Sequence, residues 1–95
     1  MGKILSDEQK EKYTKLLSEN LAMLRAKAGI TQEELSNLLG ISRQTYSAME
    51  SQGRPISWNT YLSLIYIYDN IPDTSSIIHK LDIIPADLIL NLPGK

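Results

Sequence analysis

Two long hydrogen-bonding side chains, Arg43 and Gln44, stand next to each other in a short segment whose other outward positions are small. Arginine fits the paired acceptors of guanine, and glutamine fits the acceptor–donor pair of adenine, so both residue types can read bases in the major groove of DNA. Small neighbours let a helix backbone approach the base edges. At about 100° per residue, one face of the segment consists of Arg43, Gln44, Ser47, Ala48 and Ser51.

The opposite side of this segment carries Ser42, Tyr46 and Met49, so we expect it to pack inward. Every amphipathic helix has a polar side, and in an isolated helix the outward residues would be ordinary surface residues. That interpretation is weaker here, because the outward face has a single charge, Arg43, where a merely solvated helix would favour Lys and Glu. The face therefore favours a helix that reads DNA.

Capping signals predict the helices that position this face. Ser6 and Gln9 have the form of a capping box that begins a helix over residues 7–28, and Thr31 and Glu34 form a second one. Glycines follow both helices and end them. The apolar stripe of the first helix comprises Tyr13, Leu17, Leu21, Leu24 and Ala28, and that of the second comprises Leu35, Leu38 and Leu39.

A third helix must begin almost at once after the second. Only Ile41 separates Gly40, which ends the second helix, from Ser42, a good N-cap. Two short helices joined by such a turn make a helix-turn-helix unit. This unit is the organising feature of the chain.

The remainder of the chain predicts further helices. The fourth, about 58–69, is apolar nearly all round, which indicates burial on more than one side. After a turn at residues 70–73 we expect a fifth helix over Thr74–Leu81 and a sixth over Pro85–Leu92, with proline near its first turn. The fold class is therefore all-α, with five or six helices.

The composition excludes several classes of function. The chain has 95 residues, no cysteine and one histidine, His79, which excludes Cys–His catalysis and multi-histidine metal sites. We therefore expect no enzyme and no metal or other cofactor. No stretch approaches the roughly 20 apolar residues of a membrane-spanning helix. The first residues turn polar too soon for a signal peptide, so we expect a cytoplasmic protein with no membrane partner.

The charge distribution is uneven although the net charge is only −1. Residues 1–28 carry six Lys and Arg against four acids, a net of +2, whereas residues 29–54 have a net of −1 and residues 55–95 a net of −2. The total argues mildly against a nucleic-acid partner, since such proteins often have a basic surplus. A locally positive face could still attract phosphate.

The run from Gln32 to Glu50 resembles the helix-turn-helix of phage lambda repressor and Cro, also called the xenobiotic-response-element family. The run has the family's Gln, Leu, small residue, Gly, Ile, Ser and Glu at matching offsets, and the resemblance covers about residues 17–70. Two positions depart from the pattern. Ser36 stands where alanine is usual, and Tyr46 replaces the usual Ile or Val, so Tyr46 must either fill a larger core slot or lean outward.

The resemblance implies roles position by position. The family's base-facing positions correspond to Arg43, Gln44, Ser47 and Ala48. The implied phosphate contacts are Gln32, Thr45, Arg54 and, more weakly, Asn59. Arg25 and Glu50 correspond to the family's structural ion pair, which ties the first helix to the third. Two alternatives stay open, that Gln32 is only a capping neighbour and that Arg54 is only a loop cation.

We therefore expect a lambda-repressor-like DNA-binding domain over residues 1–70 and a helical extension over residues 71–95 that packs on the fourth helix. The expected function is a sequence-specific transcriptional regulator, a repressor of operator DNA, acting on double-stranded DNA as a homodimer through the C-terminal helices. Two alternatives remain. The apolar tail could be entirely intrachain core, or the chain could be an antitoxin or another protein-interaction module with an unknown protein partner.

Overall fold

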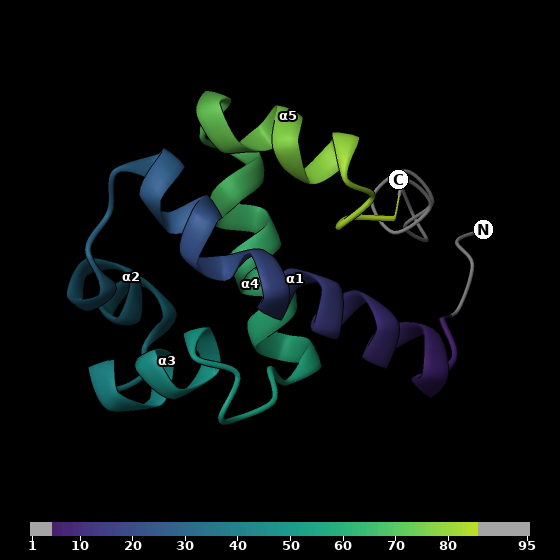
Figure 1. The fold of residues 1–95 in the computed structure, drawn as a ribbon, viewed down its shortest axis with the longest axis horizontal. Helices are drawn as coiled ribbons and strands as arrows, with labels where there is room; N and C mark the ends of the chain where they lie inside the picture. Colours follow the sequence, from purple (N-terminus) through teal and green to yellow (C-terminus); the bar gives the residue numbers. More distant parts are fainter. Residues whose placement is uncertain (1–4, 86–95) are drawn as a thin grey trace, which may run out of the picture.

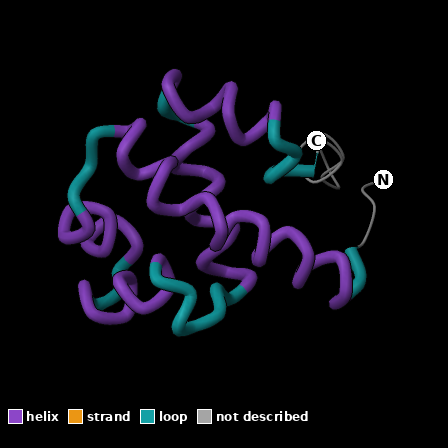
Figure 2. The backbone as a smooth tube through the Cα atoms, in the orientation of Figure 1, coloured by secondary structure: helices purple, strands orange, loops and turns teal. Residues whose placement is uncertain are grey.

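A computed structural model describes residues 5–85. This part of the chain is all-helical and contains no strand, as the sequence predicts (Figures 1 and 2). Its helices are α1 (Asp7–Ala28), α2 (Gln32–Leu39), α3 (Arg43–Glu50), α4 (Trp58–Asp69) and α5 (Pro72–Lys80). Within the described residues no helix is long and apolar enough to cross a membrane.

The predicted capping boxes are present and begin α1 and α2. The Ser6 hydroxyl accepts from the Gln9 backbone N–H, and the Gln9 side chain accepts from the Ser6 backbone N–H. Thr31 and Glu34 repeat this exchange at α2. Hydrogen bonding to the Thr31 backbone, and then to its side chain, lowers the pKa of Glu34. Each box satisfies two backbone groups that the first helical turn leaves without partners.

The turn between α2 and α3 is as tight as predicted. Gly40 ends α2 with φ 72°, in the left-handed region that other residues adopt at a cost. The Ile41 N–H then donates to the Ser36 carbonyl, and the Ser42 hydroxyl caps α3 by accepting from the Thr45 N–H. Ile41 is therefore the single residue between the glycine that ends α2 and the serine that begins α3. This short turn fixes the angle at which α3 leaves it.

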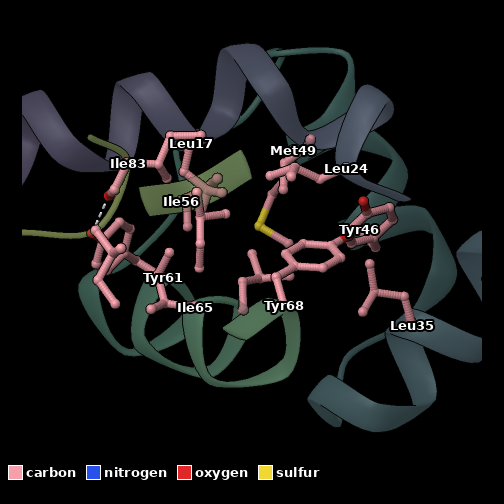
Figure 3. Packing of buried hydrophobic residues seen from close by; sticks show 14 residues of the cluster. Leu17, Leu24, Leu35, Tyr46, Met49, Ile56, Tyr61, Ile65, Tyr68 and Ile83 are labelled. Carbon is pink, nitrogen blue, oxygen red and sulfur yellow. Dashed lines mark hydrogen bonds between the residues drawn. The ribbon is translucent and has the colours of Figure 1, made fainter. Parts of the chain in front are cut away.

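All five helices contribute to the core, and Figure 3 shows its packing. Leu17, Leu21 and Leu24 of α1 are fully buried, in agreement with the predicted stripe. Tyr46 is also fully buried, so it fills a larger core slot and does not lean outward. The Tyr61 hydroxyl donates to the Ile83 carbonyl, which fastens the segment after α5 to α4.

Three expectations need correction. Leu38, predicted on the apolar face of α2, is 64% exposed, because Leu35 and Ser36 fill the buried side of that short helix. The fourth helix, predicted to be buried on more than one side, has one buried side, and Leu62 and Tyr66 are exposed. Its buried side carries four residues, Tyr61, Leu64, Ile65 and Tyr68.

The fifth helix also begins earlier than predicted, at Pro72 and not at Thr74. Proline suits a first helical position because its missing N–H needs no partner there. Thr74 is buried within the helix, and its hydroxyl donates to the Tyr68 carbonyl at 2.7 Å. The predicted sixth helix, apart from Pro85, falls outside the described residues.

Candidate nucleic-acid interface

The outward face of α3 forms an open hollow of about 480 Å³. Arg43 and Gln44 are exposed at its rim, and Ser47 and Ala48 are partly exposed. The side chains at these last two positions, one turn further along the helix, are short. The hollow is lined by the five residues that helical geometry puts on this face, namely Arg43, Gln44, Ser47, Ala48 and Ser51.

The inward face of α3 is built from Tyr46 and Met49, both buried, whereas Ser42, also predicted to pack inward, is exposed because it lies at the N-cap. Figure 3 shows them among side chains from α1, α2 and α4. Burial raises the pKa of the Tyr46 hydroxyl far above its usual value, so this hydroxyl stays protonated. The Tyr46 and Tyr68 hydroxyls are both buried without a hydrogen-bond partner among the described residues. Apolar contacts of the Tyr46 and Met49 side chains therefore hold this face of α3 against the core.

A bidentate ion pair fixes the end of α3 to α1. Arg25 donates from Nε and Nη2 to the two carboxylate oxygens of Glu50, both at 2.9 Å, and from Nη1 to the Ile30 carbonyl at 3.1 Å. The Glu50 side chain is only 10% exposed. The hydrogen bonds from Arg25 lower the pKa of Glu50 and raise that of Arg25, so both groups stay charged at neutral pH.

Gln32, at the first position of α2, lies beside Arg43 of the outward face of α3. It shares an open hollow of about 340 Å³ with Arg43, and this hollow is also lined by Arg25, Thr31 and Glu33. Two residues predicted for different roles, one for a phosphate and one for a base, therefore meet at one place. The helix N-terminus adds free backbone N–H groups that favour an anion, while Glu33 opposes one.

The other predicted phosphate contacts are more dispersed. Arg54 is exposed in the loop between α3 and α4 and lines a third hollow with residues of α1. Thr45 is partly exposed in the first turn of α3, where its hydroxyl accepts from that of Ser42 at 2.9 Å. Asn59 is exposed in the first turn of α4. These two residues line none of the three hollows described above.

Sequence reasoning did not single out Lys15, which lines the same hollow as Arg54. The positive surplus of residues 1–28 was the available signal, but charge counting does not say which lysine faces the loop. Among residues 5–85, no group of three His, Asp or Glu side chains is placed to hold a metal ion.

Comparison with known proteins agrees with this geometry. Residues 21–57 match the family model described as helix-turn-helix, a span that runs from the middle of α1 to the residue before α4. No curated protein and no solved structure matches the chain. The matched family is one of DNA-binding regulatory domains with an all-α fold, and it is not typically enzymatic. Residues 21–57 of this chain are therefore similar to the lambda repressor/Cro-like helix-turn-helix family of DNA-binding domains.

Proposed function

We propose that this chain is a transcriptional repressor that binds operator DNA sequence-specifically, with α3 in the major groove. The observation that carries the proposal is the outward hollow of α3, where Arg43 and Gln44 rise from a floor of small residues. Arg43 pairs with the O6 and N7 acceptors of a guanine, and Gln44 pairs with N6 and N7 of an adenine. Ser47 and Ala48 let the helix approach the base edges closely enough for both contacts.

Phosphate contacts on both sides of α3 would set its register on the duplex. We assign these contacts to Gln32 on one side and to Arg54 and Asn59 on the other, with Thr45 at the start of α3. The shared hollow of Gln32 and Arg43 supports this assignment, because a glutamine that holds a phosphate there also steadies the reading arginine. The pair Arg25–Glu50 takes no part in reading and keeps α3 at a fixed angle to α1.

The proposed assembly is a homodimer joined through the C-terminal helices, with residues 1–70 as the DNA-binding domain and residues 71–95 as the extension. Twofold symmetry then requires a pseudo-palindromic operator with half-site centres about 34–36 Å apart. Light scattering of the full chain, alone and with its selected duplex, tests this assembly. A single protomer on the duplex would contradict it.

Selection of bound sequences from a pool of random duplexes tests the reading role. We expect Arg43→Ala to relax the preference at one base pair and to weaken binding to the best site by about 5- to 150-fold, or about 1–3 kcal/mol. Arg54→Ala should weaken binding to all DNA sequences alike and flatten the slope of log K against log salt by about one unit. Lys27→Ala, at an exposed lysine in the last turn of α1, is the matched control. Unchanged selection by the Arg43 variant would refute its reading role.

A protein-interaction module, such as an antitoxin with this fold, is the second candidate. Four large apolar side chains on the surface favour it, with Tyr66 the most exposed at 72%. The others are Leu38, Leu62 and Leu81. Absence of any sequence preference at low and moderate salt, together with a protein that co-purifies with the chain, would favour this function over operator binding.

A further inference from the structure

The third hollow, of about 290 Å³, lies between the N-terminal half of α1 and the loop that follows α3. Two cations from different elements line it, Lys15 of α1 and Arg54 of the loop, together with one carboxylate, Glu11. Both cations are exposed, and neither forms an ion pair within residues 5–85. Its remaining lining residues are Thr14, Ser18, Gln52, Gly53, Pro55 and Ile56.

The walls of this hollow are held in place. The Ser18 hydroxyl donates to the Met49 carbonyl at 3.5 Å, which links α1 to the end of α3. The Gly53 N–H donates to the Ala48 carbonyl at 2.9 Å, and Ile56 is buried. A preformed site loses less conformational entropy when it binds than one that must be ordered first.

A second contact ties the start of α1 to the start of α4. The ammonium group of Lys10 lies 5.6 Å from the centre of the Trp58 ring, which itself stacks on Tyr61. In Figure 1 this half of α1 extends away from α2. It also precedes residue 21, where the match to the helix-turn-helix family begins. Lys15 is therefore supplied by a part of the chain that the family match does not cover.

This hollow adjoins the outward face of α3. Ala48 and Ser51 line the outward hollow of α3, and Gln52 and Gly53, the next residues along the chain, line this one. A duplex seated on α3 would therefore continue past Arg54 and Lys15. We propose that this hollow binds a backbone phosphate flanking the bases that α3 reads, with Lys15 and Arg54 as its two cationic contacts. This inference rests on the proposed function, because it uses the same docked duplex.

Glu11 provides a test that distinguishes a phosphate site from a purely structural role of Lys15. A phosphate in the hollow would be attracted by Lys15 and repelled by Glu11, so neutralising either side chain changes binding in opposite directions. Glu11 and Lys15 are four residues apart on α1, and neither forms an ion pair within residues 5–85.

The experiment measures the affinity of the full chain for its selected duplex between 50 and 200 mM salt. We expect Lys15→Gln to flatten the slope of log K against log salt by about 0.9. Between 50 and 200 mM salt the variant's affinity then falls by a factor about threefold smaller than that of the wild type. The same variant binds more weakly at 50 mM salt and keeps its sequence preference. Glu11→Gln binds more tightly at 50 mM salt, and Lys27→Gln, at an exposed lysine that lines none of the three hollows, matches the wild type.

The outcomes separate this inference from the proposed function. If the wild type shows sequence preference that Arg43→Ala relaxes, while Lys15→Gln and Glu11→Gln both bind like the wild type, the phosphate site is refuted and the reading role stands. If the wild type shows no preference but the two variants shift binding in opposite directions, the phosphate site stands and operator reading fails. Thermal unfolding of both variants checks that they fold like the wild type.

Discussion

The ion pair Arg25–Glu50 offers the sharpest test of how the fold positions α3. Replacing Glu50 by Gln removes the charge that accepts two hydrogen bonds of 2.9 Å from Arg25, and replacing Arg25 by Ala removes all of its donors. The double variant completes a thermodynamic cycle, which isolates the energy of the pair from the separate effects of the two residues.

The expected magnitude follows from the exposure of the two side chains. Exposed ion pairs contribute about 0–1 kcal/mol, whereas breaking a buried pair costs about 3–5 kcal/mol because one charge is left without a partner. Arg25 is 24% exposed and can be rehydrated, while Glu50 is only 10% exposed. We therefore expect a loss of about 2 kcal/mol for Glu50→Gln, about 3 kcal/mol for Arg25→Ala, and a coupling energy of about 2 kcal/mol.

Urea unfolding at pH 7 measures these free energies, and a loss of 2 kcal/mol corresponds to a fall in Tm of about 8–16 °C in a domain of this size. A coupling energy below about 0.5 kcal/mol, as for an exposed pair, would refute the reasoning.

Acid titration tests the same pair independently, through the direction in which stability changes with pH. Because Arg25 lowers the pKa of folded Glu50 below 4.5, the stability from this group is complete above pH 4.5 and lost as the pH falls through the folded pKa. The difference in the free energy of unfolding between the wild type and Glu50→Gln should therefore shrink as the pH falls through this range.

Two further substitutions test the packing and the turn. Tyr46→Phe removes a buried hydroxyl without a partner, so we expect a stability within about 1 kcal/mol of the wild type or above it, measured by thermal unfolding; a loss of 3 kcal/mol would show that the hydroxyl is hydrogen-bonded. Gly40→Ala meets no atom within 4 Å but forces a left-handed backbone on alanine, so we expect a loss of about 1 kcal/mol in urea unfolding, and Gly40→Asn should lose less; no loss would mean that the turn relaxes.

Local signals predicted the first four helices because each boundary is set by a few adjacent residues. Ser6 with Gln9, and Thr31 with Glu34, satisfy helix N–H groups within one turn, and such exchanges depend on no other part of the chain. The outward face of α3 was predictable for the same reason. Its five residues follow from helical periodicity alone once the helix is known to begin after Ser42.

The predictions that failed concern helix bounds and side-chain burial that depend on contacts between helices. Thr74 has the chemistry of a helix cap, but the Tyr68 carbonyl of α4 takes its hydroxyl, and Pro72 begins α5 instead. Leu38 fits the apolar spacing of α2, yet a helix of eight residues needs only Leu35 and Ser36 at its buried side. The sequence left two placements open for Tyr46. The space between α1, α2 and α4 accommodates its ring, and no local pattern encodes that space.

The division of α3 between two sets of side chains has an engineering consequence. Tyr46, Met49 and Glu50 attach the helix to the rest of the protein, and none of them lines the outward hollow. The outer positions can therefore be randomised as a library while the three anchoring residues are kept, with little penalty in folding. Variants that recognise new duplexes would be obtained on an unchanged scaffold.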